Sequence, residues 1–208
     1  MSAADEPGNE DGPPPGPPGA INEQVQHSYV SARVPTNIGR GVFSTGAVVF
    51  DGVHEFVLDF LMRLGSPHQV AARVVMPHHV FGQLIAALKD NLGKYEQRFG
   101  RPAPLPPPPP NQPRGSISEL YEQLKLPDEA LSGTYANAVM IGHTPSEFWF
   151  DFITTFYPRS AVSCRVFLSA QQIPGLLETL HSAHLKHQQK QSGPPLEPPP
   201  EPPPETGL

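Results

Sequence analysis

Three histidines near the end of the chain have a spacing that could bind a metal ion. His181, His184 and His187 follow one another at intervals of three residues, so adjacent members share a helical face, and imidazole is a common zinc ligand. The first and third lie further round the helix, and no carboxylate partner is evident. We therefore predict no metal site and keep these histidines as candidates, against the simpler interpretation of a solvated helix end. His78 and His79 we interpret as solvent-facing residues at another helix start.

Catalytic motifs do not occur in the sequence. It has no phosphate-binding glycine loop, zinc-protease helix motif, paired-cysteine motif or nucleophile elbow. No spacing of serine, histidine and aspartate suggests a triad. We therefore expect a protein that is not an enzyme and uses no cofactor.

Charge and hydropathy argue against two further classes of partner. The net charge is −6, and the 14 lysines and arginines form no basic stripe, which argues against nucleic acid. No window approaches the length of an apolar membrane span, and the first residues lack a basic start followed by an apolar run. We expect a soluble, unexported, cytoplasmic protein without membrane contact.

The clearest pattern in the sequence is a duplication at an offset of ninety-two residues without a gap. Forty-eight aligned positions contain ten identities, which is typical of a tandem repeat. The identical residues are Gly41, Glu55, Phe56, Asp59, Phe60, Val70, Arg73, Val74, Leu84 and Leu88, matched by Gly133, Glu147, Phe148, Asp151, Phe152, Val162, Arg165, Val166, Leu176 and Leu180. Cys164 aligns with Ala72, so we interpret the single cysteine as a small buried side chain.

Each repeat predicts three strands followed by a helix. In the first repeat, β-branched and alternating apolar residues predict strands over 43–50, 54–61 and 70–76. Apolar residues at helical spacing then predict a helix from Pro77 to about Gly100. In the second repeat the helix start carries a capping-box pattern, Ser169-Ala-Gln-Gln172, while Pro174-Gly175 is expected to bend or weaken the helix.

These elements predict an α+β fold built as an internal pseudo-dimer. A three-stranded antiparallel sheet with one C-terminal helix buries only a small core and leaves a sheet face and its edges exposed, so it needs a second unit to cover them. We therefore expect the two β-β-β-α repeats to pack on each other within the chain, and a further homo-oligomer is an open alternative. The arrangement is similar in outline to the export chaperone SecB, by analogy of shape alone.

Two charged pairs fix the expected register of the second and third strands. Placing Asp59 opposite Arg73, and Asp151 opposite Arg165, also places apolar residues of the two strands opposite one another on one face of each sheet. We interpret both pairs as structural cross-strand ion pairs, worth about 0.2–1 kcal/mol if exposed.

The face that carries these charges is also the possible partner surface. The functional alternative for the ion pairs is a charged recognition site that Glu55 and Glu147 join. Trp149 aligns with Val57 on the same face, away from the phenylalanines of the core. An aromatic side chain there packs against the other repeat or against a partner.

Proline divides the chain into folded and unfolded parts. The 29 prolines concentrate in segments that lack large apolar side chains, which predicts solvated polyproline stretches. We expect the following organisation: a disordered acidic tail over 1–25, the first repeat over 26–100, a proline-rich linker over 101–116, a short helix with the second repeat over 117–190, and a disordered tail over 191–208.

Several segments resemble a bacterial and archaeal family known as domain of unknown function 3467. In the second repeat these are GTYANAVMIGHTPSEFWFDF from Gly133 and CRVFLS from Cys164. In the first repeat they are EFVLDF, ARVVMP and the helix end LKDNLGKYEQRFG, an ending that the second helix lacks. The resemblance implies a fused pair of units of about a hundred residues each, and it implies no activity, because the family has none assigned.

We expect from these observations a non-enzymatic interaction module. An exposed sheet face or edge would bind a protein or peptide partner, with the proline segments as spacers or as ligands of aromatic grooves. The alternative is a regulatory protein that binds a metal or small ligand through the C-terminal histidines.

Overall fold

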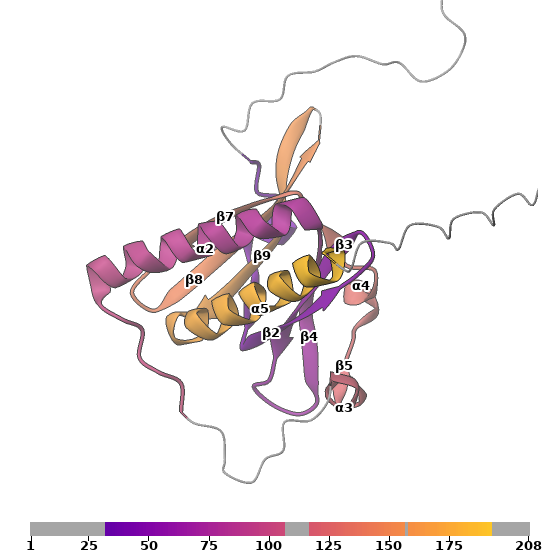
Figure 1. Ribbon diagram of the computed structural model, residues 1–208, viewed down its shortest axis with the longest axis horizontal. Helices are drawn as coiled ribbons and strands as arrows, with labels where there is room; N and C mark the ends of the chain where they lie inside the picture. The colour runs from indigo at the N-terminus through magenta and orange to yellow at the C-terminus, as the bar shows by residue number, and fades with distance from the viewer. Residues whose placement is uncertain (1–31, 107–116, 157, 193–208) are drawn as a thin grey trace, which may run out of the picture.

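A computed structural model describes residues 32–106, 117–156 and 158–192 (Figure 1). The predicted tail over 1–25, most of the predicted linker and nearly all of the tail over 191–208 lie outside these residues. The described chain is α+β and consists of two roughly repeated halves. The first repeat comprises α1 (Thr36–Gly39), β1 (Val42–Ser44), β2 (Gly46–Asp51), β3 (Glu55–Met62), β4 (His68–Pro77) and α2 (His78–Phe99).

The second repeat follows the same order with a longer entry segment. It comprises α3 (Ile117–Glu122), β5 (Leu124–Lys125), α4 (Asp128–Leu131), β6 (Thr134–Tyr135), β7 (Ala138–His143), β8 (Glu147–Phe156), β9 (Arg159–Ser169), the short 3-10 turn η1 (Ala170–Gln172) and α5 (Ile173–Gln191). No helix in the described ranges is long and apolar enough to cross a membrane.

The strands form two sheets that exchange their first short strands. The N-terminal sheet has the order β2-β3-β4-β5, with β6 also pairing β4, and the C-terminal sheet has the order β1-β9-β8-β7. Val42 of β1 pairs with Val166, and its counterpart Thr134 of β6 pairs with Val74, both in parallel. Each repeat therefore contributes a strand to the other repeat's sheet.

The single strand predicted over 43–50 is wrong. The chain turns after Ser44, whose hydroxyl donates to the carbonyl oxygens of Gly46 and Leu61. Residues before this turn join the C-terminal sheet as β1, and residues after it form β2 in the N-terminal sheet. Local β propensity cannot distinguish one strand from two that belong to different sheets.

The predicted register of the longer strands is confirmed in both sheets. Asp59 pairs with Arg73 and Phe60 with Ala72, and Asp151 and Phe152 pair in the same way with Arg165 and Cys164. One bulge per sheet, after Phe60 and after Phe152, shifts the pairing toward the hairpin ends. The same sequence pattern thus produces the same geometry twice.

The two repeats share one hydrophobic core. Figure 1 shows α2 and α5 together on one face of the strands, and each packs against the first hairpin strand of the other repeat, α2 on β7 and α5 on β2. The core is continuous across both halves, and its largest fully buried members include Phe56, Phe60, Phe81, Leu84, Phe148, Phe150, Phe152 and Leu168. The repeats therefore form the expected pseudo-dimer within one chain.

Both helix starts differ from their predictions. Pro77 precedes α2 instead of occupying its first turn, and Ser169 makes no side-chain capping bond, because η1 intervenes before α5. Pro174 lies in the first turn of α5 and does not break the helix, which runs to Gln191. Proline is tolerated there because the first helical turn has no intrahelical acceptor for its missing N–H.

Candidate functional site

Aromatic side chains cross the outer face of the C-terminal sheet, the face turned away from α2 and α5. Trp149 of β8 pairs with Phe167 of β9, which pairs with Phe43 of β1. The alternate positions along β8, including Phe148 and Phe150, are buried in the core, so these three side chains share the outer face. We call Trp149, Phe167 and Phe43 the aromatic row; Phe43 is 38% exposed.

A glycine beside the aromatic row explains the orientation of the Trp149 indole ring. Gly142 pairs with Trp149, and a Cβ at Gly142 would lie only 2.1 Å from the indole Cζ2. The ring therefore lies over the backbone of β7. In the first repeat the corresponding pair is Phe50 and Val57, with the large side chain on the opposite strand. The tryptophan and the glycine have thus changed together relative to the other repeat.

The matching face of the N-terminal sheet is covered by the chain itself. The segment 117–131, containing α3, β5 and α4, packs there through a second, smaller core centred on Leu61, Val70 and Leu124. Tyr121 contacts Phe50 edge-on, with ring centroids 5.4 Å apart. The corresponding side of the C-terminal sheet leaves Met140 50% exposed. Among the described residues, the two outer faces therefore differ in how much apolar surface they present. Residues 25–31, which correspond to 117–123 in the duplication, lie outside the described residues.

Both predicted ion pairs are present, and both carboxylates are buried. Arg73 donates from Nε and Nη2 to the two oxygens of Asp59, each at 2.7 Å, and Arg165 binds Asp151 in the same way at 2.6 and 2.7 Å. The Tyr121 hydroxyl also donates to Asp59. Hydrogen bonding to the carboxylate raises the pKa of each arginine, while burial and the Asp59 charge raise the pKa of Tyr121.

Each arginine also binds the exchanged segment of the other repeat. Arg73 Nη1 donates to the carbonyl of Leu131 at 3.1 Å, and Arg165 Nη1 donates to the carbonyl of Gly39 at 3.4 Å. These acceptors are equivalent in the duplication. The pairs thus connect sheet and exchanged segment, which is a structural role.

The two glutamates of the proposed charged site lie at turns. Glu147 accepts a hydrogen bond from Thr144 Oγ1 at 2.7 Å, and Glu55 lies against Gly52, where a Cβ would come within 2.7 Å of its Oε1. Asp59 is fully buried and faces Arg73 and Tyr121, so it offers no surface to a partner. The carboxylates of the ion pairs are therefore turned toward their arginines, while Glu147 is exposed. A charged recognition site on this face stays a prediction.

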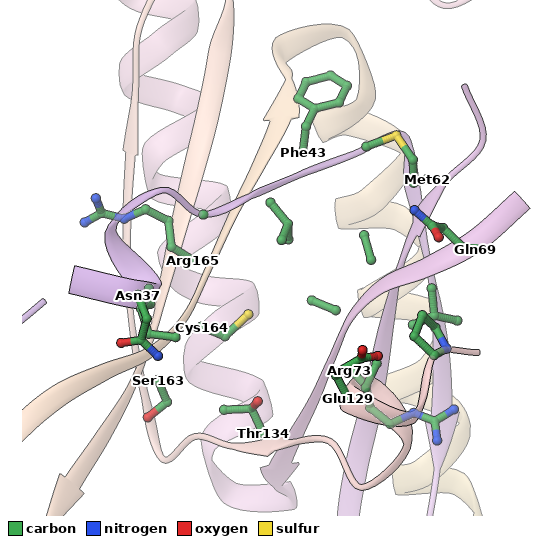
Figure 2. Close-up of a pocket in the computed structure, with 18 residues that line it drawn as sticks. Asn37, Phe43, Met62, Gln69, Arg73, Glu129, Thr134, Ser163, Cys164 and Arg165 are labelled. Carbon is green, nitrogen blue, oxygen red and sulfur yellow. The ribbon is translucent and has the colours of Figure 1, made fainter. Parts of the chain in front are cut away.

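A cavity of about 520 Å³ lies between β4 and β9 and is lined by both repeats (Figure 2). Arg73 and Arg165 contribute to its walls, but their guanidinium groups are bound to Asp59 and Asp151. Cys164 is buried there, and burial followed by the nearby Asp151 charge raises the pKa of its thiol to about 12. A protonated thiol is a poor nucleophile, so the cavity indicates no reaction.

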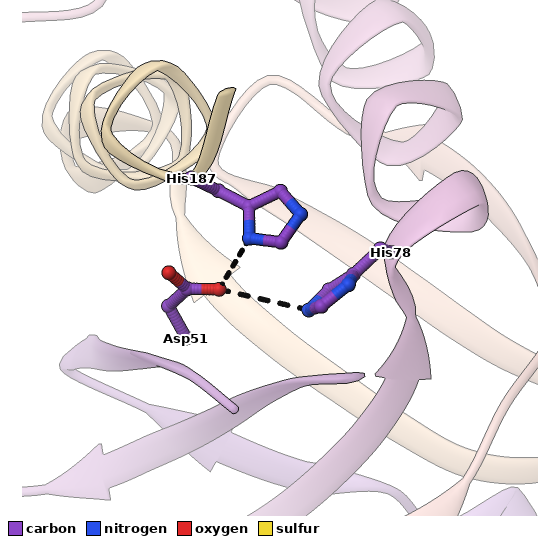
Figure 3. Close-up of side chains that lie close together, drawn as sticks. All are labelled: Asp51, His78 and His187. Atoms are coloured by element: carbon purple, nitrogen blue, oxygen red, sulfur yellow. Dashed lines mark hydrogen bonds and ion pairs between the residues drawn. The ribbon is translucent and has the colours of Figure 1, made fainter. Parts of the chain in front are cut away.

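The structure does not group His181, His184 and His187. His181 is exposed, and His184 packs toward Phe81 and hydrogen-bonds Gln188. Only His187 lies in a cluster, where its Nδ1 is 2.6 Å from Asp51 Oδ1 (Figure 3).

His78 completes the cluster around Asp51. Its Nε2 is 3.6 Å from the same Asp51 oxygen, and its ring centroid is 3.8 Å from that of His187. The side chain is 19% exposed, so the prediction that His78 faces solvent is wrong; His79 is exposed as expected. Packing of α5 against the first repeat removes His78 from water.

Comparison with protein families gives two matches to one family, "Protein of unknown function (DUF3467)", over residues 5–103 and 108–194. The chain belongs to this family. Its two matches correspond to the duplication seen in sequence and structure, so the protein is a tandem pair of DUF3467 units. Comparisons with curated proteins and with solved structures found no match. Family membership therefore assigns a fold unit and no activity.

The Asp51 cluster was not predicted, because its members come from different DUF3467 units. At the offset of ninety-two residues, Asp51 corresponds to His143 and His187 corresponds to Tyr95. Tyr95 contacts His143 with ring centroids 5.6 Å apart, so the helix of each unit reaches the first hairpin of the other. Replacement of the family-like tyrosine by His187 was the available signal, but the exchanged packing of the helices was needed to interpret it.

Proposed function

We propose that this protein is a non-enzymatic, cytoplasmic interaction module that binds a protein segment on the outer face of the C-terminal sheet. The aromatic row carries the proposal, since it places Trp149, Phe167 and Phe43 side by side on neighbouring strands. Tryptophan and other large apolar side chains dominate the binding energy of many interfaces. Met140, half exposed on the adjacent strand β7, extends the same surface.

The covered N-terminal sheet indicates the chemistry of the partner segment. There, the segment 117–131 packs Leu120, Tyr121 and Leu126 against the outer face. Its four acidic residues are exposed, namely Glu119, Glu122, Asp128 and Glu129. Because the two sheets derive from one duplicated unit, a segment of similar character fits the equivalent face. We propose an amphipathic partner segment with aliphatic and aromatic residues toward the sheet.

Site-specific photocrosslinking in cells that naturally make the protein tests this proposal. A photoreactive residue at Met140 should give partner adducts, and Trp149→Ala should abolish them by removing the central contact. Leu185 on α5 is a matched control, since it is 42% exposed but lies on a helix. Adducts that are equal at both positions, or that persist in Trp149→Ala, would contradict the proposal. A crosslink between two copies of the chain would reassign the face to self-association.

A further inference from the structure

We propose that Asp51, His78 and His187 form a binding site for a divalent transition-metal ion, with zinc(II) as the reference ion. The site is separate from the aromatic row and does not depend on the proposed partner. It retains one histidine of the sequence-based candidates and replaces the other two with residues of the first repeat. Its residues come from the end of β2, the start of α2 and the last turns of α5 (Figure 3).

The donor atoms are close enough to share one ion. One ligand atom from each of the three residues lies within 4.8 Å of the others. Zinc binds imidazole nitrogen and carboxylate oxygen at about 2.0–2.2 Å, so ligands on one ion lie a few ångströms apart. The contact between His187 Nδ1 and Asp51 Oδ1, at 2.6 Å, must open slightly to admit the ion. Two imidazoles and a carboxylate suit zinc and other first-row divalent ions.

The Nε2 atom of His78 gives independent support for a ligand. This atom is buried and makes no hydrogen bond to any described residue, while Figure 3 shows the ring directed toward Asp51. Buried polar atoms without partners are uncommon in folded proteins and call for an explanation. A metal ion between His78, Asp51 and His187 would supply the missing partner.

The proton balance of binding follows from the short contact. A hydrogen bond between His187 Nδ1 and Asp51 Oδ1 requires a proton on one of them. Gln191 Nε2 lies 2.7 Å from His187 Nε2 and can donate to it, which leaves the imidazole proton on Nδ1. Zinc bound at Nδ1 shifts that proton to Nε2, where the amide oxygen of Gln191 can accept it once the amide group turns over, so binding to neutral histidines releases no proton.

Lys190 competes with the ion. Its Nζ lies 2.8 Å from Asp51 Oδ2. Lys190 thus carries the positive charge that a divalent ion bound by Asp51 would partly replace.

An open cavity of about 470 Å³ borders the Asp51 side of the cluster and is lined by Asp51, Lys190 and residues along α5, but by neither histidine. Three protein ligands leave a position of the ion open for water. The equivalent location in the other half holds His143, Tyr95 and Ala170, which cannot supply the same three donors. The three donors are therefore present at only one of the two equivalent locations.

Metal titration of the tag-free full-length chain tests the site. Zinc should bind with a stoichiometry of one and raise the melting temperature, because the ion connects α5 to the first repeat. Cobalt(II) should give the visible absorption of a low-coordinate site with nitrogen and oxygen ligands. His78→Ala should weaken zinc binding by about a hundredfold or more, since loss of even an outer partner typically costs 10–100-fold.

Matched variants separate this site from a surface histidine pair. His181→Ala and His184→Ala lie on the same helix and should leave affinity unchanged, whereas Lys190→Gln should tighten binding. His78→Gln is a second variant at this position, and circular dichroism without metal shows whether it folds, so that lost binding is not mistaken for a folding defect. The proposal is overturned if the chain shows no saturable binding, or if binding survives both His78 variants and is lost in His181→Ala.

Discussion

Asp59 and Asp151 occupy equivalent positions, and the sequence alone identified their arginine partners. The register of the two strands predicted the pairing of each carboxylate with its arginine. It did not predict that the carboxylates are buried. Burial depends on segments from the other repeat, such as the carbonyl of Leu131 that Arg73 binds. A contact fifty-eight residues away in sequence leaves no local periodic signal.

Replacing Asp59 with alanine should lower the free energy of unfolding by about 3–5 kcal/mol, because it leaves the Arg73 guanidinium and the Tyr121 hydroxyl without their acceptor. Asp90→Ala is the control. Its partner Lys94 is one helical turn away and both side chains are exposed, so the loss should be about 0.3–0.5 kcal/mol. Urea unfolding measures both changes, and equal losses would contradict the structural role of Asp59.

Cys164 should make stability depend on pH in the alkaline range. Burial, with a smaller effect of Asp151, raises the pKa of the thiol from 9.0 to about 12. Between these values the unfolded chain loses the thiol proton while the folded chain keeps it. The free energy of unfolding should therefore fall as pH rises from about 9 to about 12, and the contribution is complete below pH 9.

The difference between wild type and Cys164→Ala isolates this effect from tyrosine and lysine titration. Alanine is the residue of the first repeat at this position. The stability of wild type relative to the variant should decline across the alkaline window. A constant difference would show that the thiol is not protected in the fold.

At the scale of elements, the sequence predicted the long strands and their register but not their ends. Alternation of apolar side chains fixed β3 and β4, whereas the division of the first strand depended on pairing with the other repeat. The capping box failed for a related reason. Ala170, Ile173 and Leu176 are buried in the shared core, so tertiary packing determined how the helix begins.

Two glycines should respond oppositely to alanine. Gly93 lies inside α2 with no atom near the position of a Cβ, so Gly93→Ala should stabilise by about 0.5–1 kcal/mol. Gly142→Ala should destabilise and shift Trp149 emission, because the new Cβ would overlap the indole. Urea unfolding and the emission spectrum check both. An unchanged spectrum in Gly142→Ala would contradict the position of the ring over β7.

At the scale of the whole molecule, the sequence predicted the duplication but not the exchange of strands and helices between the two repeats. The offset predicted two similar halves, and one core formed by both confirms their association. The partner surface was predicted only in part, through Trp149. Phe167 joins it through its pairing with Trp149, and Phe43 joins because β1 crosses to the other sheet. The Asp51 cluster forms because α5 crosses to β2. The sequence alone does not distinguish a contact within one repeat from the equivalent contact between the two repeats, because both involve the same residue types.

The central claim is that exchanged strands and helices make the two DUF3467 units one cooperative body. Equilibrium unfolding in urea, followed by far-ultraviolet circular dichroism and by Trp149 fluorescence, tests it most directly. Circular dichroism reports both units, whereas Trp149, the only tryptophan, reports the second. We predict one transition with the same midpoint and slope for both signals. Two separate transitions, with fluorescence following only one, would show that the units fold independently and would contradict the account.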